Sequence, residues 1–323
     1  MILSLAILKR VARLLPSRRR QNLDRAVETS RVMTPFASPA PMALRLALRP
    51  RLRILAYPDR PSRYQAFFKL CAFNGYRIVT DPAEPFDLAI HFAYQAEPCR
   101  LPLSVPVINR RCSDVSKDTV ARLFEQTFGY ALDVDPLIFE GRLIEKPRDN
   151  YTYEGRILQG PLHADQMRSD RVYQRFVDTR DGSEAVDLRV PIYGGRIPIA
   201  YEKRRPMAGD LKDWATAQIR RPEEALSAEE RDQLVAFADV IGLDYGEVDV
   251  LRDISDGRIY VVDVNNTPAG PPKQMSNAEI YEALEILSPD FKWLVKAVRP
   301  ESPPQSPAVA RLGDRTTPLQ DGT

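Results

Sequence analysis

The chain is poor in the residues on which most metal-centred and nucleophilic chemistry in proteins depends. Its 323 residues include three cysteines, Cys71, Cys99 and Cys112, with no CxxC pair, and two histidines, His91 and His163, far apart. This cysteine usage predicts neither a disulfide framework nor a zinc site. Two distant histidines argue against a histidine-based metal site and against a Ser-His-Asp triad. The few cysteines indicate a reducing, cytoplasmic compartment.

The sequence also lacks a strong charge imbalance and a long apolar run. Lysine and arginine number 46 against 44 acidic residues, which gives a formal net charge of +2. A nucleic-acid binder needs a concentrated positive face, so the overall charge argues against that class. No apolar stretch approaches the roughly 20 residues that a membrane span requires. With 44% hydrophobic and 28% charged residues, the composition is that of a globular protein with a large core.

The N-terminal 50 residues stand apart because they contain ten lysines and arginines but only two acidic residues. Within residues 1–20, apolar side chains recur near helical spacing with basic side chains between them. Two interpretations stay open: peripheral contact of a basic amphipathic helix with an anionic membrane surface, or an extension with a solvated basic face. The Pro- and Ala-rich stretch 31–50 is predicted to be a linker. The tail, residues 299–323, is predicted to be disordered.

Residues 51–112 alternate between apolar strands and one helix. The expected strands are 53–57, 76–80, 86–94 and 105–109. The helix is expected over 62–75, with Ser62 as its N-cap and Gly75 as its C-terminal stop. Strand–helix–strand alternation predicts a small parallel sheet, so this region is expected to form an N-terminal α/β lobe.

Residues 113–298 mix helices with antiparallel hairpins and are expected to form one larger domain. The expected helices are 113–130 with Asp114 as cap and Gly129 as stop, one from the Ser227–Glu230 capping box to Gly242, and one after the Ser276–Glu279 capping box. Single strands are expected at 142–147 and 171–178. The expected hairpins are 186–203, around Gly194-Gly195, and 245–265, which turns at Asp256-Gly257.

The second hairpin contains the residues that point to chemistry. Asp249 and Asp263 lie on its two strands at similar distances from the turn, so they are expected to converge with Asn265. Neighbouring carboxylates repel each other unless a cation intervenes, and carboxylate and amide oxygens are ligands that Mg²⁺ prefers. For this motif alone, a metal site and simple polar turn chemistry over residues 263–268 stay equally open.

The stretch GLDYGEVDVLRDISDGRIYVVDVNNTPAG resembles the metal-binding hairpin of the ATP-grasp superfamily, which includes D-alanine–D-alanine ligase, bacterial glutathione synthetase and glutamate-adding ligases. Their pattern is an acid, a D-G-type turn, then acid-x-Asn before a Pro-containing loop, here Asp249, Asp263 and Asn265. The family more often has glutamate in the place of Asp263. The resemblance covers about residues 105–272. It implies an α/β (α+β) ATP-grasp fold, with a small N-terminal parallel α/β lobe and two α+β lobes enclosing the nucleotide.

Three further segments resemble the superfamily in the same order along the chain. LIEKP looks like the strand whose lysine, here Lys146, reaches the nucleotide phosphates. VYQRFVDT looks like the hinge whose backbone reads the adenine edge, which implies a nucleotide-binding role for Gln174, Arg175 and Phe176. DLRVPIYGG is similar to the strand whose acid holds the ribose hydroxyls and whose arginine faces the phosphates. Those two residues are Asp187 and Arg189.

Other positions match less closely or depart from the family. Lys117 occupies roughly the place of the first nucleotide lysine, and residues 147–161 stand where the family has a mobile phosphate-covering loop. Glu247 stands where D-alanine–D-alanine ligase has an arginine that stabilises the developing oxyanion. The segment LKDWATAQIRRPEE lacks the Arg-x-Asn of the peptide-type ligases. The basic run Lys203–Arg205 either faces an anionic substrate or phosphate, or is a solvated basic strand end.

Together these segments imply an ATP-dependent ligase that joins a carboxylate to an amine or thiol through an acylphosphate, with Mg²⁺ or Mn²⁺ as the metal. Arg189 and Lys203 would be the catalytic residues, and the partners would be small-molecule or peptide carboxylates and amines rather than nucleic acid. Two alternatives stay open. One is a kinase of the same fold that phosphorylates a hydroxyl, and the other is a non-catalytic nucleotide-binding protein.

Overall fold

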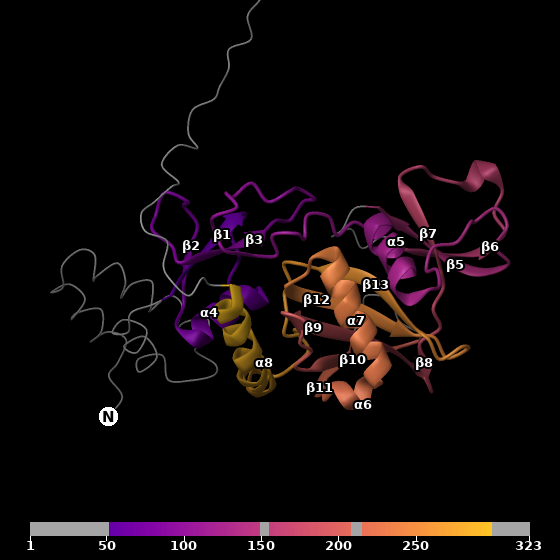
Figure 1. Cartoon of the computed structure of the whole chain (residues 1–323). Coiled ribbons are helices and arrows are strands. Elements are labelled where there is room, and N and C mark those ends of the chain that lie inside the picture. The colour runs from indigo at the N-terminus through magenta and orange to yellow at the C-terminus, as the bar shows by residue number, and fades with distance from the viewer. Residues whose placement is uncertain (1–51, 149–154, 208–214, 299–323) are drawn as a thin grey trace, which may run out of the picture.

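The computed structural model describes residues 52–148, 155–207 and 215–298, which form three β-sheets side by side (Figure 1). The predictions for residues 1–50 and 299–323 lie outside these residues. The expected phosphate-covering segment 147–161 is described only in part. Over the described part of the chain, no helix is both long and apolar enough to cross a membrane.

The first sheet is parallel, as the sequence predicts. Its strands, in the order β2-β1-β3-β4, are β1 (Arg53–Pro58), β2 (Arg77–Val79), β3 (Leu88–Phe92) and β4 (Val107–Ile108). Helix α4 (Ala66–Asn74) ends at Gly75, whose φ of 71° favours glycine. The predicted N-cap, Ser62, is wrong. Ser62 lies in a turn in which its N–H donates to Gln65 Oε1 at 2.6 Å, so Gln65 takes the N-cap position.

The central sheet is antiparallel and has six strands. These are β8 (Arg180–Asp181), β9 (Glu184–Tyr193), β10 (Ala200–Pro206), β11 (Thr216–Arg220), β12 (Tyr245–Arg252) and β13 (Ile259–Asn265). The order is β11-β10-β9-β12-β13, and β8 pairs with β9. Both predicted hairpins are confirmed as β9–β10 and β12–β13. Gly257, with φ of 72°, lies in the turn of the second hairpin.

The third sheet is small and antiparallel, with the order β6-β5-β7. It contains β5 (Gly141–Pro147), β6 (Arg156–Gly160) and β7 (Arg171–Arg175), and the short 3-10 helix η1 (Ala164–Gln166) lies between β6 and β7. Strand β6 corrects the sequence analysis, which places residues 156–160 in the phosphate-covering loop. In this strand only Gly160 is buried, so no buried apolar run marks it in the sequence.

Helices cover one face of the central sheet. They are α5 (Lys117–Phe128), α6 (Pro222–Ala225) and α7 (Ala228–Ile241), while α8 (Asn277–Val298) lies beside α4. The predicted capping boxes at Ser227 and Ser276 are confirmed, because each serine exchanges hydrogen bonds with the glutamate three residues later. Asp114 is not the cap of α5. Ser116 takes that position, and Asp114 instead accepts a hydrogen bond from the Ser116 N–H.

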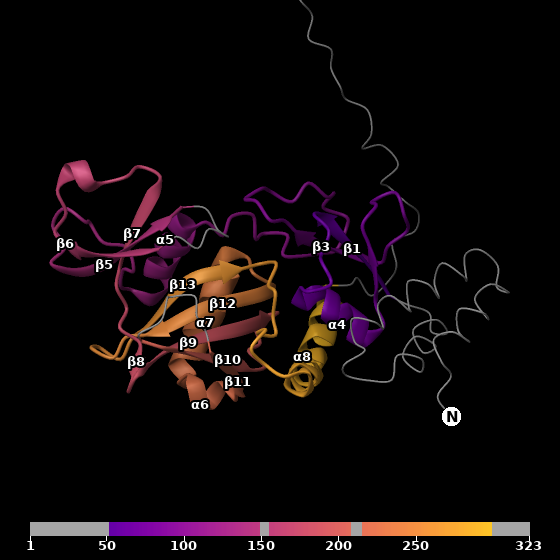
Figure 2. The ribbon, with the colours of Figure 1, turned by 180° about the vertical axis from the view of Figure 1, so that it is seen from behind.

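Alternation along the central strands gives the sheet two unlike faces. Leu188, Val190 and Val248 form a core with Phe124 of α5 and Phe237 of α7. Helix α7 therefore lies in front of the sheet in Figure 1 and behind it in Figure 2. The residues that alternate with these apolar positions are polar and face the other side, where the candidate site lies.

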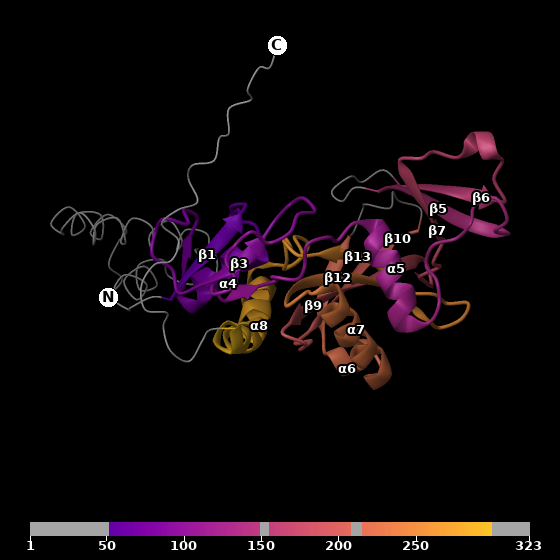
Figure 3. The same cartoon turned by 45° about the horizontal axis from the view of Figure 1, so that its top comes forward.

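The first sheet and the central sheet share one hydrophobic core. Phe67 of α4, Tyr193 and Tyr245 of the central sheet, and Phe291 of α8 all belong to it. The ring of Phe67 lies 5.8 Å from that of Tyr245 and 6.1 Å from that of Phe291, measured between centroids. Helix α8 accordingly lies between the N-terminal sheet and the central sheet (Figure 3).

Candidate nucleotide and metal site

The two acids of the second hairpin face each other across β12 and β13. Asp249 pairs directly with Asp263, and Glu247 pairs with Asn265. On the other side of β12, Arg189 of β9 is the register partner of Asp249. Side chains directly opposite each other in an antiparallel pair have Cβ atoms about 4.5–5.5 Å apart. The structure therefore brings Asp249 and Asp263 together at one level of the sheet, and Asn265, two residues further along β13, reaches Asp263 through a 3.3 Å hydrogen bond.

The two carboxyl groups have opposite electrostatic environments. Burial raises the pKa of Asp263, and the neighbouring charge of Asp249 raises it further. Burial also acts to raise the pKa of Asp249, but Arg189 and Lys203 outweigh it and lower that pKa to about 2. Asp263 is left beside a like charge, and its Oδ2 accepts a hydrogen bond from Asn265 Nδ2 at 3.3 Å.

This donor set fits Mg²⁺. Facing carboxylates supply hard oxygen donors, and a cation between them would relieve the repulsion that raises the Asp263 pKa. Throughout the described residues, no group of three or more His, Cys, Asp or Glu is arranged to hold a metal. The remaining ligands of an ion on Asp249, Asp263 and Asn265 would be water and phosphate oxygens, which Mg²⁺ commonly keeps.

The two predicted catalytic residues lie beside Asp249. Arg189 donates to both carboxylate oxygens, with Nε 2.7 Å from Oδ1 and an Nη 2.8 Å from Oδ2. Lys203 Nζ lies 2.7 Å from Asp187 Oδ2 and 3.9 Å from Asp249 Oδ1. Because Lys203 is only 5% exposed, the interpretation as a solvated strand end is wrong for this residue. Arg204, one residue on, points to the opposite face and pairs with Glu202 at 2.8 Å.

Asp187 has a carboxylate oxygen available for a ligand. Its Oδ2 is held by Lys203, whereas its Oδ1 is buried without a hydrogen-bond partner in the described part of the chain. Burial raises the pKa of Asp187 to about 6, against the opposing effect of Lys203. A buried oxygen without a partner is costly, and a ribose hydroxyl is the kind of donor that would satisfy it.

Lys117 and Lys146 approach the acid pair from other elements. Lys146 of β5 donates from Nζ to Gln174 Oε1 at 3.0 Å, and Gln174 Nε2 donates to Asp133 Oδ1 at 3.0 Å. Burial lowers the pKa of Lys146 to about 8, although the charge of Asp263 opposes this. Lys117 is buried at the start of α5, and its charge acts on both Asp263 and Lys146.

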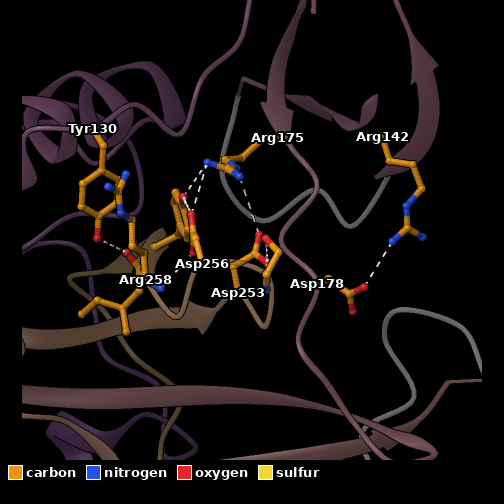
Figure 4. A network of polar contacts seen from close by, with 10 residues as sticks. Tyr130, Arg142, Arg175, Asp178, Asp253, Asp256 and Arg258 are labelled. Carbon is orange, nitrogen blue, oxygen red and sulfur yellow. Dashed lines mark hydrogen bonds and ion pairs between the residues drawn. The ribbon is translucent and has the colours of Figure 1, made fainter. Parts of the chain in front are cut away.

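Arg175 belongs to a different network, at the turn end of the second hairpin (Figure 4). An Nη of Arg175 donates to the Tyr260 hydroxyl at 2.6 Å, and the guanidinium lies 3.9 Å from Asp253 and 3.8 Å from Asp256. Its backbone N–H donates to Leu132 O at 2.9 Å. The structure therefore does not bring the Arg175 side chain to the acid pair.

Phe176 is also occupied elsewhere. The guanidinium of Arg142 lies 4.0 Å from the centroid of the Phe176 ring. The backbone N–H of Phe176 donates to Arg142 O at 3.0 Å. Neither Arg175 nor Phe176 therefore has its N–H available for an adenine edge. Of the three hinge residues named from the sequence, Gln174 alone contacts another site residue, Lys146.

Two groups at the site were not predicted from the sequence to have a role there. They are Glu247, which stands where D-alanine–D-alanine ligase has an arginine, and Lys69. Glu247 is fully buried, and burial raises its pKa to about 7 against the opposing charge of Arg189. Lys69 of α4 donates to Gly270 O at 3.1 Å, on the loop that follows β13. An acid at position 247, in the place of that arginine, was the one sign in the sequence that this residue could matter. Nothing in the local spacing could connect Lys69 with a loop some 200 residues later.

No family model and no curated protein matches the chain. Among solved structures, D-alanine–D-alanine ligase from Bacillus anthracis, complexed with ATP, aligns with a TM-score of 0.50 and 15% identity, covering 77% of this chain and 99% of that one. Macrocyclase MdnC from Microcystis aeruginosa MRC, bound with precursor peptide MdnA, has a TM-score of 0.48 and 13% identity, covering 76% and 99%.

The ATP-grasp ligase PsnB, complexed with a phosphomimetic variant of its minimal precursor, Mg and ADP, aligns with a TM-score of 0.43 and 18% identity. The alignment covers 60% of this chain and 62% of PsnB, so the chain spans less than two thirds of that protein. At these identities, the match to the Bacillus anthracis ligase shows the fold alone. That fold is the one the hairpin motif predicts.

Proposed function

We propose that this chain, which has the ATP-grasp fold, is an ATP- and Mg²⁺-dependent ligase that joins a carboxylate to an amine. The observation that carries the proposal is the facing pair Asp249 and Asp263. Cationic side chains from β5, β9, β10 and α5 surround this pair, and each alters the pKa of one or both acids. Such a convergence of buried charges, with pKa values shifted in opposite directions, is typical of a functional site.

The nucleotide would be held by residues from several elements. Asp187 Oδ1 would accept a ribose hydroxyl, which gives that buried oxygen its hydrogen bond. Lys117 and Lys146 would neutralise phosphate charge. Gln174 keeps the Lys146 ammonium in place through the 3.0 Å hydrogen bond. A magnesium ion on Asp249, Asp263 and Asn265 would supply charge neutralisation and hold phosphate oxygens in position.

The reaction would proceed by transfer of the γ-phosphoryl group of ATP to a substrate carboxylate, which releases ADP and gives an acylphosphate. The amine would then attack the carbonyl carbon, the bond to phosphate would break, and the nitrogen would lose a proton as inorganic phosphate leaves. Arg189 and Lys203 would stabilise negative charge on the transferring group. No side-chain nucleophile takes part, in accord with the few cysteines and histidines of the chain.

The first prediction concerns Asp263. Asp263→Ala removes one of two facing carboxylates, so Mg²⁺-dependent ADP release is expected to fall by at least about 100-fold while the circular dichroism spectrum stays unchanged. The matched control is Asp232→Asn on the exposed side of α7, which should leave ADP release at the wild-type rate. Full ADP release by Asp263→Ala would refute the metal assignment.

The substrates are to be found by measuring ADP release with panels of amino acids, peptides and amino sugars. A ligase yields an amide together with inorganic phosphate. A stable phosphate ester among the products would instead identify a kinase of the same fold. Mg²⁺-dependent nucleotide binding without turnover of any compound would favour the non-catalytic alternative.

A further inference from the structure

Glu247 is a buried acid without a hydrogen-bond partner. Its side chain is 0% exposed, and neither carboxylate oxygen has a hydrogen-bond partner within the described residues. It lies on the same face of β12 as Asp249, since residues two apart in a strand point to the same side. An acid that is buried without hydrogen bonds destabilises a fold. Its presence at the edge of the site therefore requires a reason.

Arg189 is the one described cation within ion-pair distance of Glu247, with 3.7 Å between Arg189 Nε and Glu247 Oε2. Lys69 of α4, whose charge also acts on Glu247, donates instead to the carbonyl oxygens of Ala269 and Gly270 at 3.4 and 3.1 Å. The hydroxyl groups of Tyr193, Tyr201 and Tyr245 are buried nearby, and none donates to Glu247.

Arg189 is committed to Asp249 in this structure. Its Nε and one Nη donate to the two oxygens of that carboxylate at 2.7 and 2.8 Å, which is a two-point fork. The proposed metal uses the same carboxylate. A guanidinium and a divalent cation on one carboxylate repel each other, so metal binding at Asp249 is opposed for as long as the fork persists.

We propose that Glu247 is the alternative partner of Arg189: when a divalent cation binds Asp249 and Asp263, the guanidinium moves from Asp249 to Glu247. This inference rests on the proposed function, because it requires a metal at the acid pair. A shift of about 1 Å brings Nε from 3.7 Å to hydrogen-bond distance of Oε2. The exchange gives the buried Glu247 carboxylate a partner and keeps Arg189 paired.

The surroundings keep Glu247 in place for this exchange. A Cβ at Gly270 would overlap Glu247 Oε1, so the backbone of the loop after β13 lies directly against the carboxylate. Lys69 holds that loop through its two hydrogen bonds. Among the described cations, Arg189 is the one that lies within ion-pair distance of this carboxylate.

The test measures metal affinity rather than turnover. Mn²⁺ binding is followed by electron paramagnetic resonance in the presence of a non-hydrolysable imido analogue of ATP, for wild type, Glu247→Gln, Arg189→Met and the double variant. We expect Glu247→Gln to weaken Mn²⁺ binding by about 5- to 20-fold, because the neutral amide competes poorly with Asp249 for the guanidinium. In the Arg189→Met background the same change should alter Mn²⁺ affinity by less than twofold, because that variant has no guanidinium that could pair with residue 247.

Glu202→Gln is the matched control, because Glu202 lies on β10 of the same sheet but on the opposite face. It should leave Mn²⁺ affinity at the wild-type value. Unchanged Mn²⁺ affinity in Glu247→Gln would overturn the exchange, and so would an equal loss in both backgrounds, which would indicate a merely structural acid. A wild type that binds no Mn²⁺ with the nucleotide analogue would overturn the proposed function together with the exchange. Nucleotide-dependent Mn²⁺ binding that ignores Glu247 would overturn the exchange alone.

Discussion

Individual charges at the site are arranged so that two acids, Asp187 and Asp249, have a hydrogen-bonded cation, whereas Asp263 and Glu247 do not. Asp187 is paired with Lys203 and Asp249 with Arg189, while Asp263 faces a like charge and an amide. Buried ion pairs add little stability, because desolvation offsets their attraction. On strands β9, β10, β12 and β13 the site has four acids and two cations. This excess of acids is therefore better explained by a ligand that supplies positive charge.

Lys146 leads to a prediction about pH. Burial lowers its pKa to about 8, and phosphate groups favour the charged ammonium, so the pKa with nucleotide bound is higher. Nucleotide affinity should therefore be level below pH 8 and should fall as the pH rises above 8, by at most about tenfold per pH unit. Lys146→Arg keeps its charge throughout this range and should remove the fall. Calorimetric titration of ATP without metal, from pH 7 to 9.5, measures both profiles, and identical profiles would contradict the prediction.

The approximate level of the acid pair could be predicted from the sequence, because Asp249 and Asp263 lie at similar distances from the Asp256-Gly257 turn. That they face each other could not, because it depends on a register shift between Asp249 and Val250: nearer the turn Val250 pairs with Val261, and a strict continuation would set Asp249 opposite Val262. The two-residue period of a strand puts Lys203 and Arg204 on opposite faces, although in the sequence they form one basic run. The partners of Arg175 and Phe176 could not be predicted. Both side chains contact residues from other elements, and spacing within one segment says nothing about such contacts.

At the scale of the elements, glycines end three helices in the left-handed conformation, and one of them also marks a close approach. Gly242 follows α7 with φ of 77°, and a Cβ built there would lie 2.6 Å from the carbonyl carbon of Arg111. Gly257, in the β12–β13 turn, has φ of 72°, but a Cβ built on Gly257 would have no other atom within 4 Å. A side chain at Gly257 would therefore cause backbone strain alone, whereas one at Gly242 would cause backbone strain and a steric clash.

Alanine at these two positions should therefore destabilise the fold to different extents. Gly257→Ala should cost about 1–2 kcal/mol of unfolding free energy, because alanine must adopt a left-handed conformation. Gly242→Ala has the same cost and should lose about 1–3 kcal/mol more, because its methyl group displaces the Arg111 backbone. Urea unfolding followed by circular dichroism gives both values. Equal losses would show that the chain at Arg111 moves aside without cost.

Elements with a buried side could be predicted, and those without one could not. The strands β9 and β12 have near-continuous buried positions, and α7 and α8 begin with capping boxes. Strand β6 has one buried residue, and β11 likewise buries only Ala217. Both lie at sheet edges, where one neighbouring strand is enough to fix them and the hydrophobic pattern is weak.

At the scale of the whole molecule, the described residues form two large cores and smaller separate clusters, one of them in the N-terminal sheet around Leu55 and Val107. The first core joins the N-terminal sheet, α8 and the central sheet, and the second joins the central sheet to α5 and α7. Asn109, at the end of β4, adds a polar link, because its side chain donates to Tyr245 O at 2.7 Å and accepts from Tyr245 N–H at 2.8 Å. The sheet β6-β5-β7 has its own cluster of Leu143, Leu162 and Tyr173.

This division predicts unequal local stability. The cluster of the small sheet has far fewer buried apolar residues than the two large cores. Its strands should therefore open locally while the central sheet stays folded. In native-state hydrogen exchange, amides of β5 and β7 should therefore exchange with a lower opening free energy than amides of β9 and β12. Adding the Mg²⁺ complex of the imido analogue should raise protection most in β5, since Lys146 would bind phosphate while the central strands are already protected by their cores. Equal opening free energies in the two sheets, with or without nucleotide, would mean that the small sheet unfolds only with the rest of the chain, and Lys146 would then be fixed before nucleotide binds.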